Sequence, residues 1–433
     1  MTLRRIFLLG AALRLLVAWF LAPANNDPHL EFIEFVVREG RLPFADEVTL
    51  GFQPPLYYLV AAPLWWLSGS AKVVQLLSLA LSILNLWLIV RFLEGTPVIA
   101  SERGRRQAAL LAAVLPQFVL FSAFVSNDAL AFPVGTWLFL CLVRWIERPT
   151  RKSLTLLALA QGIGLLTKGT FIAYLPIAAG AIAAVGLREH RPWRAVLAAL
   201  AWFGLLAALV GGYKFAENAW RFGTPVVSND ELGQAWLVHQ QGTWQGCSSL
   251  VDVDVTKLVR EPFIAESNRH SIPLLLYGTF WWALIRESNF EHTRELLGAA
   301  VPRAIYVLAL VPSLLLCLGG AAGLWRLRRP WRDLAAPEER FRERAVELAA
   351  LLALAGQLAL VLAWGFKHDA WSFFQARLAF AAFLSLALLL ARGFDALARR
   401  PALARAGALA TLALHAAFAV YYAAEIAGEL AET

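Results

Sequence analysis

Charged residues are scarce in this sequence. Only 16% of its 433 residues are Asp, Glu, Lys or Arg, whereas 59% are hydrophobic and the mean hydropathy is +0.59. Soluble domains carry about a quarter charged residues, so the composition argues against a soluble globular protein. The apolar residues gather in runs close to the length of a bilayer crossing, which is about 20 residues for a helix. The sequence therefore predicts a polytopic membrane protein.

Several motifs are also missing. The three cysteines lack metal-ligand spacing, and Cys247 stands alone in a polar stretch, which disfavours an intrachain disulfide. No glycine-rich phosphate loop of the Walker or dinucleotide-binding kind occurs, and no cytoplasmic domain of any size is expected. These absences argue against ATP or a soluble nucleotide sugar as the energy source on the inner side. The net charge of +8 comes from basic residues in short loops, which indicates membrane orientation and no nucleic-acid partner.

The apolar runs predict an all-α bundle of about eleven transmembrane helices. We expect them at residues 6–22, 73–92, 107–125, 129–146, 153–167, 170–187, 195–213, 303–325, 345–365, 378–391 and 406–424. The run Pro54–Leu67 is too short to span at about 1.5 Å per residue, so we expect a juxtamembrane or re-entrant helix there. Residues 272–285 are expected to form an interfacial helix, with Trp281 and Trp282 at the headgroup level.

Arginine-rich connections define the orientation. With the N-terminus in the cytoplasm, the inner connections are 91–106, 144–152, 188–194, 325–344 and 392–405, and all are short and basic, as the positive-inside rule requires. The N-terminal run is long for a signal peptide and contains Arg14, so we expect it to stay as a helix. The chain is then one multi-pass domain of a plasma (inner) membrane. Its residues 23–72, residues 214–300 and its C-terminus are expected to lie outside.

The first polar segment after the N-terminal helix is the candidate for chemistry. It runs from Asn25 to Tyr58 and holds the carboxylates of Asp27, Glu31, Glu34, Glu39, Asp46 and Glu47. Carboxylates concentrated at one mouth of a membrane protein indicate a functional site. Lys168 and Arg377 are predicted at the same face. A cation between apolar helices is costly unless it is paired, and a lipid phosphate is one partner that would explain it.

Five motifs follow one another on this predicted face. They are GRLP at 40–43, QPPLYY at 53–58, SNDALA at 126–131, LLTKGTFIAYLP at 165–176 and QARLAFAAF at 375–383. In this order they resemble the GT-C superfamily of integral-membrane glycosyltransferases, and are similar to the branch of protein mannosyltransferases and aminoarabinose transferases. The resemblance implies transfer of a sugar, with inversion, from a polyprenyl-phosphate lipid to a glycan, lipid or protein acceptor. It also implies a reaction that generally needs no metal.

The resemblance implies that an aspartate of the first outer loop acts as the base. Related bacterial chains often have Asp-Glu with a histidine three residues after the glutamate. Counting back from His29 gives Asn25 and Asn26 at those positions. Asp27 is the nearest carboxylate, although displaced, and we assign it the catalytic role.

The candidate substrate-binding residues are His29, Glu47, Gln53, Tyr57, Asn127, Asp128, Lys168 and Arg377. Lys168 and Arg377 are expected to hold the phosphate and to stabilise the charge that develops on it. Structural alternatives exist, such as a helix N-cap for Asn127 and Asp128 or an aromatic belt for Tyr57. No cofactor is expected, although Asp27 and Asp128 offer a thin oxygen shell for a divalent cation.

Two other classes of protein stay open. Membrane carboxylates and a lysine also suit a secondary transporter, but here they sit at one face without matched helix breaks at mid-membrane depth. The Asn25-Asn26 pair is instead compatible with a catalytically degenerate GT-C-like scaffold.

Overall fold

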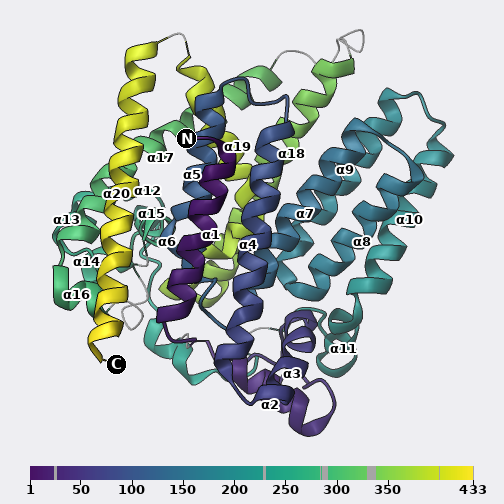
Figure 1. Cartoon of the computed structure of the whole chain (residues 1–433). Helices are drawn as coiled ribbons and strands as arrows, with labels where there is room; N and C mark the ends of the chain where they lie inside the picture. The colour runs from purple at the N-terminus through teal and green to yellow at the C-terminus, as the bar shows by residue number, and fades with distance from the viewer. Residues whose placement is uncertain are drawn as a thin grey trace.

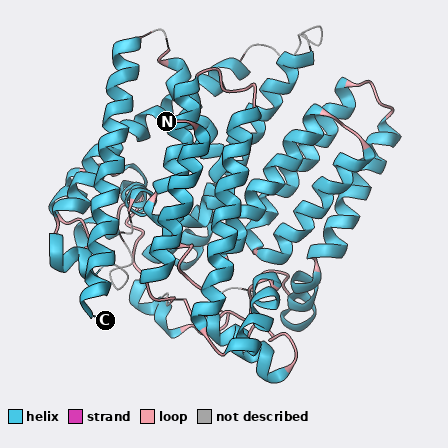
Figure 2. Cartoon of the chain, in the orientation of Figure 1, coloured by secondary structure: helices cyan, strands magenta, loops and turns pink. Residues whose placement is uncertain are grey.

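The computed structural model confirms an all-α bundle (Figures 1 and 2). It describes residues 1–23, 27–227, 231–282, 284, 291–328, 338–398 and 400–432. Within these ranges the regular elements are helices, and strand-like pairing is limited to one isolated bridge between Gln241 and Ala370. Eight of the described helices are long and apolar enough to cross a membrane.

Each predicted membrane run overlaps a long helix of the bundle. These helices are α1 (Leu3–Phe20), α4 (Ala71–Gly95), α5 (Glu102–Val114), α7 (Asp128–Glu147), α8 (Arg151–Thr167), α9 (Tyr174–Arg188), α10 (Trp193–Gly211), α17 (Ala300–Leu327), α18 (Glu338–His368), α19 (Phe383–Ala396) and α20 (Pro401–Glu432). Three of the eleven are not among the eight: α5 has 13 residues, α8 has 17, and α1 carries three arginines. The helices α9 and α19 reach spanning length together with the 3-10 turns before them, as Gly169–Arg188 and Trp371–Ala396. The predicted positions are therefore confirmed more firmly than the number of crossings.

Shorter helices cover one end of the bundle, opposite the N-terminus (Figure 1). Near that end lie α2 (His29–Glu39), α3 (Leu56–Ser68) and α11 (Tyr213–Phe222). With 13 residues, α3 is the short apolar helix that the sequence predicts. The long loop adds η2 (Ala235–Gln240), α12 (Ser248–Val251), α13 (Thr256–Arg260), α14 (Glu266–Arg269), α15 (Ile272–Trp281) and α16 (Glu291–Leu297).

The prediction of one continuous helix at residues 107–125 is wrong. α5 ends at Val114, Leu115 is extended, and the short α6 (Pro116–Leu120) follows. Pro116 lacks the N–H that would bond the carbonyl four residues back, and it biases the preceding residue away from helix. The Arg14 guanidinium of α1 replaces that bond, donating to the carbonyl oxygens of Ala112 and Ala113 at 2.9 Å each. Arg14 thus finds backbone partners inside the bundle.

The expected placement of the tryptophans of residues 272–285 is also wrong. The helix α15 forms, but Trp281 and Trp282 are each only 1% exposed. The Trp281 indole donates to Ser313 Oγ at 2.8 Å, and the centroid of the Trp282 ring lies 5.5 Å from that of Phe263 and 6.3 Å from that of Tyr306. The two rings therefore pack against other parts of the protein, where Tyr and Trp need a polar partner, and do not face lipid headgroups.

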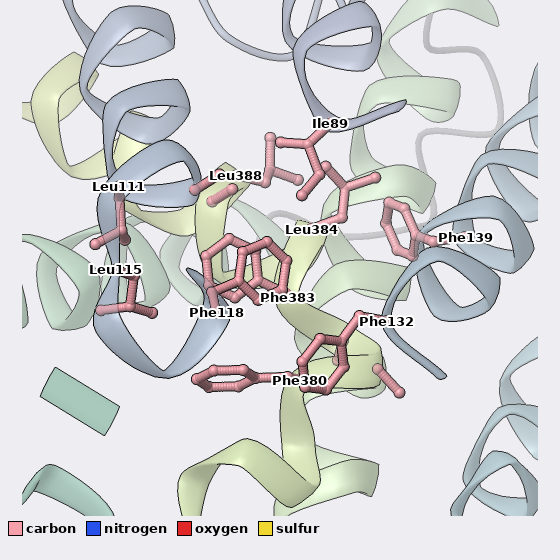
Figure 3. Close-up of a cluster of buried hydrophobic side chains, with 14 of the residues drawn as sticks. Ile89, Leu111, Leu115, Phe118, Phe132, Phe139, Phe380, Phe383, Leu384 and Leu388 are labelled. Carbon is pink, nitrogen blue, oxygen red and sulfur yellow. The ribbon is translucent and has the colours of Figure 1, made fainter. Parts of the chain in front are cut away.

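Stacked phenylalanines occupy the centre of the bundle (Figure 3). The ring of Phe118 lies 4.1 Å from that of Phe383 and 5.4 Å from that of Phe132, measured between centroids. Phe132 in turn lies 5.6 Å from Phe380. Inside a bilayer, such close packing holds helices together without help from water exclusion. The cluster joins α6, α7 and α19 with the 3-10 helix η5 (Ala376–Ala382) that precedes α19.

The approach of α7 to η5 depends on a glycine. A Cβ atom at Gly135 would lie 2.1 Å from the carbonyl oxygen of Ala381, a distance that no side chain tolerates. Gly135 therefore lets the two backbones touch. Since Asp128 begins α7 and Arg377 belongs to η5, this contact and the phenylalanine cluster fix the relative position of the two site residues.

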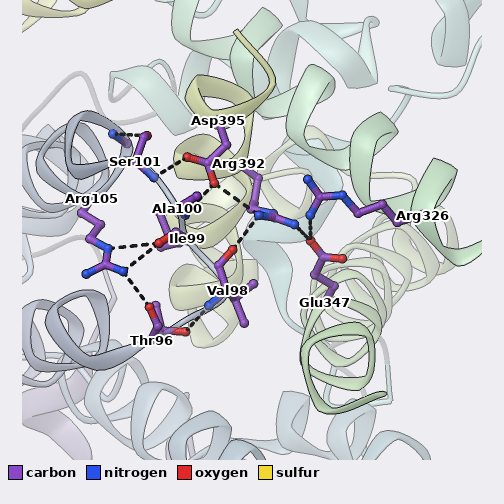
Figure 4. Close-up of polar contacts among 11 residues, drawn as sticks. Thr96, Val98, Ile99, Ala100, Ser101, Arg105, Arg326, Glu347, Arg392 and Asp395 are labelled. Carbon is purple, nitrogen blue, oxygen red and sulfur yellow. Dashed lines mark hydrogen bonds and ion pairs between the residues drawn. The ribbon is translucent and has the colours of Figure 1, made fainter. Parts of the chain in front are cut away.

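A polar network links helices at the end of the bundle opposite α2, α3 and α11 (Figure 4). Glu347 of α18 accepts hydrogen bonds from Arg326 of α17, at 2.9 Å, and from Arg392 of α19. Arg392 also donates to Asp395 at 3.2 Å, and Asp395 accepts from the backbone N–H groups of Ala100 and Ser101. Buried charges are tolerated when they are paired in this way. This network anchors the connection before α5 to the α17–α19 layer, far along the chain.

Candidate active site

Asp128 is the centre of a buried charge cluster. Its side chain is 4% exposed, and one carboxylate oxygen accepts from the ammonium of Lys168 while the other accepts from Arg377 at 3.1 Å. Asp128 is also the first residue of α7, where the partial positive charge of the helix N-terminus favours a carboxylate. Its backbone N–H donates to Ser126 Oγ at 3.2 Å. Two cations and a helix end therefore hold this carboxylate.

Arg377 connects Asp128 with Asp27, which lies between α1 and α2. The two terminal nitrogens of its guanidinium donate to Asp128 at 3.1 Å and to Asp27 at 3.2 Å, and Nε donates to Gln375 Oε1 at 2.7 Å. The guanidinium also lies over the ring of Phe121, 5.4 Å from its centroid, a cation–π contact. Residues 350 positions apart in the chain thus meet in one ion pair.

Lys168 lies where α8 ends and the 3-10 helix η1 (Gly169–Ala173) begins. The negative end of the α8 dipole favours a cation at this position. The lysine is 8% exposed, so its ion pair with Asp128 offsets the cost of burial. The two carboxylates and two cations of this cluster have a formal net charge of zero. Both cations pair with the same carboxylate, that of Asp128.

His29 and Tyr57 lie behind the cluster and position it. The His29 ring bonds Tyr58 Oη at 3.0 Å through Nδ1 and Ser126 Oγ at 3.1 Å through Nε2. The Tyr57 hydroxyl accepts from the Ser126 N–H at 3.1 Å. His29 and both tyrosines are buried, and the Tyr57 hydroxyl also shares a hydrogen bond with Ser78 of α4. They fix the turn just before Asp128, which gives them a positioning role.

Burial lowers the pKa of His29 to about 4, against a smaller opposing effect of Asp27. The ring is therefore neutral at neutral pH, with one nitrogen that donates and one that accepts. A neutral ring adds no charge to the four-charge cluster. Below its ordinary pKa near 6.5, the unfolded chain would bind a proton that the folded site refuses, so this histidine costs stability as the pH falls from about 6.5 toward 4.

Gln53 and Asn127 extend the polar site beside Asp128. The Asn127 amide donates to Gln53 Oε1 at 3.3 Å. This bond joins the Gln-Pro-Pro turn before α3 to the start of α7. The sequence placed both residues on one face, and the structure brings them into contact.

Glu47 lies apart from the charge cluster. It makes a two-fold ion pair with Arg41, both distances being 2.7 Å, and accepts from the Phe44 N–H at 2.8 Å. The hydrogen bond from Arg41 is the main reason why the pKa of Glu47 is lowered to about 2. With Glu31 and Asp46 it lines a hollow of about 250 Å³. Glu47 therefore shapes the loop between α2 and α3, and its predicted contact with substrate stays a prediction.

Arg377 donates to an oxygen of both Asp27 and Asp128, the two carboxylates considered as ligands for a divalent cation. Among the described residues, no group of three His, Cys, Asp or Glu side chains is arranged to hold a metal ion. The expectation that no cofactor is needed stays a prediction.

Sequence reasoning missed three contributors. Gln375 orients Arg377, while Ser126 and Tyr58 hold His29. All three lie inside the motifs QARLAFAAF, SNDALA and QPPLYY. Their residue types do not differ from those of chosen neighbours such as Gln53 and Tyr57, and only the tertiary contacts show which side chains support the cluster. Asn25 and Asn26, which replace the expected acidic pair, lie outside the described residues.

Fold and site together define a multi-pass membrane protein with a charged centre at one end of an all-α bundle. Residues 53–211 match the family model described as dolichyl-phosphate-mannose-protein mannosyltransferase. That segment includes Gln53, Tyr57, Asn127, Asp128 and Lys168. No curated protein matches the chain in sequence.

Solved structures are similar in fold. The oligosaccharyltransferase of Archaeoglobus fulgidus, in complex with Zn and sulfate, has a TM-score of 0.51 and 16% identity, covering 99% of this chain and 53% of its own. The chain thus spans about half the length of that enzyme. ArnT of Cupriavidus metallidurans bound to undecaprenyl phosphate has a TM-score of 0.40 and 14% identity, covering 91% and 77% of the two chains. Arabinosyltransferase EmbB of Mycobacterium smegmatis has 0.40 and 13%, covering 92% and 41%.

The family match and the archaeal structure agree with the fold described above. The chain has the fold of the archaeal oligosaccharyltransferase. Residues 53–211 are similar to a family of membrane glycosyltransferases, which agrees with the class that the motifs predicted.

Proposed function

We propose that the chain transfers a glycosyl unit from a polyprenyl-phosphate donor to an acceptor on the outer side of a plasma (inner) membrane. The observation that supports this most is the convergence of two buried cations, Lys168 and Arg377, on Asp128 at one end of the bundle. Paired cations that converge at a membrane surface suit a lipid-linked phosphate. The ArnT structure, which holds undecaprenyl phosphate, is an example of such a ligand in a membrane enzyme.

In this reaction the acceptor hydroxyl attacks the anomeric carbon while the phosphate leaves from the opposite face, so the configuration inverts. Asp27 takes the proton of the acceptor hydroxyl as general base. Lys168 and Arg377 stabilise the second negative charge that develops on the leaving phosphate. Glycan, lipid and protein hydroxyls are all compatible acceptors, and the outer loops lie where an acceptor would approach.

Removal of either cation should weaken donor binding. Lys168→Ala and Arg377→Ala each remove a charged hydrogen bond to phosphate, worth about 1.5–3 kcal/mol, or roughly tenfold or more in Kd. Binding of undecaprenyl phosphate to the protein in nanodiscs measures this by native mass spectrometry. Lys214→Ala is a matched control, because Lys214 is also buried near the outer end but pairs with Glu217 and the Pro43 carbonyl. Wild-type affinity in both site variants would contradict the phosphate assignment.

The orientation of the chain also has a direct test. Cys247 is exposed in the long loop and Arg103 is exposed at the opposite end, in a basic connection. An impermeant maleimide applied to intact cells should label Cys247, because basic loops stay in the cytoplasm. In a chain with Cys247→Ser, Cys317→Ala and Arg103→Cys, labelling should require permeabilised cells. Labelling of position 103 in intact cells would invert the proposed topology and place the site inside.

A further inference from the structure

Every nitrogen of the Arg377 guanidinium already has a partner within the protein. Nε donates to Gln375, and the two terminal nitrogens donate to Asp128 and Asp27. The side chain is 8% exposed, so few directions are left for a new ligand. Three of the five guanidinium N–H groups are used in these bonds, so a phosphate that pairs closely with this guanidinium competes with the three present partners. The identity of the partner that gives way decides what donor binding does to the site.

Asp128 is the partner least able to leave. It is buried, paired with both cations and held at the start of α7. Removing it would leave two buried cations without their shared counter-charge. Gln375 belongs to the same short segment as Arg377 and is itself anchored, because its amide donates to the Ser372 carbonyl at 2.7 Å.

Asp27 is the partner that can leave. Its side chain is 35% exposed, against 4% for Asp128, so water can solvate it once the ion pair opens. Only the arginine of this ion pair is buried, and a phosphate offers that arginine several strong acceptors.

We propose that the donor phosphate displaces Asp27 from Arg377, so that donor binding itself releases the base. This inference rests on the proposed transfer reaction. A carboxylate that accepts a hydrogen bond from a guanidinium is held in its charged form and takes up a proton less readily. While the donor is absent, Arg377 therefore restrains Asp27. Once the phosphate occupies Arg377, the freed carboxylate can accept the acceptor proton, which makes the reaction ordered, with the donor first.

The charges balance along this sequence. The donor phosphodiester carries one negative charge and Asp27 another. Transfer forms the bond between the acceptor oxygen and the anomeric carbon and breaks the bond between that carbon and the phosphate oxygen. The proton passes to Asp27, and the lipid phosphate leaves with two negative charges, which Lys168 and Arg377 face. Departure of the lipid phosphate lets Asp27 lose its proton to water and pair with Arg377 again.

Carbodiimide labelling of carboxyl groups tests this coupling, because the reagent couples fastest to protonated carboxyls. The full chain in nanodiscs is labelled near pH 6.5 with and without saturating undecaprenyl phosphate, and each site is quantified by peptide mass spectrometry. Loss of a neighbouring cation raises a carboxyl pKa by about 1–3 units, so labelling of Asp27 should rise roughly tenfold or more. Labelling of Asp128 should stay low. Undecaprenol, which lacks the phosphate, should change neither.

Arg377→Gln supplies the matched variant. Without lipid it should already show the raised labelling of Asp27, and lipid should raise it no further. If wild-type protein binds undecaprenyl phosphate while labelling of Asp27 stays constant, the coupling is wrong and the proposed function stands. If labelling rises at Asp128 instead, or with undecaprenol, the coupling through Asp27 is equally wrong. If undecaprenyl phosphate does not bind at all, the coupling and the donor assignment fall together.

Discussion

Asp27→Asn should lower the single-turnover rate of sugar transfer by about 100- to 10,000-fold, the usual cost of losing a general base. Asparagine keeps the size of aspartate but does not accept a proton at neutral pH. Because the Asp27 side chain is 35% exposed, the replacement should leave the fold intact. Undecaprenyl phosphate should bind at least as tightly as it does to the wild type, since both cations remain and the Asp27 carboxylate no longer competes for Arg377. The rate is measured with purified protein and donor lipid.

Amide replacements of neighbouring carboxylates are the controls. Glu31 and Glu34 are exposed on α2, and Asp46 and Glu47 pair with Arg221 and Arg41. Each of these four variants should keep a rate within a few-fold of wild type. Full activity in Asp27→Asn together with an inactive Glu47→Gln would assign the base to Glu47. Activity in these five variants and in Asp128→Asn would contradict a carboxylate base.

Asp128→Asn should destabilise the protein by about 3–5 kcal/mol, the typical cost of removing one partner from a buried ion pair. Lys168 and Arg377 would lose the carboxylate that they share. Thermal unfolding in detergent should therefore shift down clearly for Asp128→Asn and hardly at all for Asp27→Asn. Equal unfolding temperatures for the two variants would contradict the central, buried role given to Asp128.

Much of the fold was predictable because it depends on local composition. Runs of apolar residues of near-bilayer length marked each long helix, and the length of Pro54–Leu67 marked α3 as too short to span. The effect of a single residue with a strong backbone preference could also have been predicted, but it was overlooked. Pro116 breaks the predicted third helix, and the sequence alone contained that signal.

The geometry of the site was only partly predictable. Because an even number of predicted crossings separates them, Asp27, Asp128, Lys168 and Arg377 were placed at one face of the membrane. The structure brings these four residues into a single cluster. Which of them pair could not be read from the sequence, since Arg377 reaches Asp27 across 350 positions. The burial of Trp281 and Trp282 likewise depends on tertiary contacts, and an aromatic pair in an apolar segment does not reveal whether it faces protein or lipid.

The most direct test of the proposed function is a comparison of lipids from cells with and without the gene. Liquid chromatography with mass spectrometry quantifies polyprenyl-phosphate sugars in the membrane extract. Deletion should make one such lipid accumulate while a surface glycan or glycolipid loses the matching sugar. The wild-type chain should restore both, and Asp27→Asn should restore neither. An unchanged profile of lipid-linked sugars and surface glycans in the deletion strain would contradict a glycosyltransferase function.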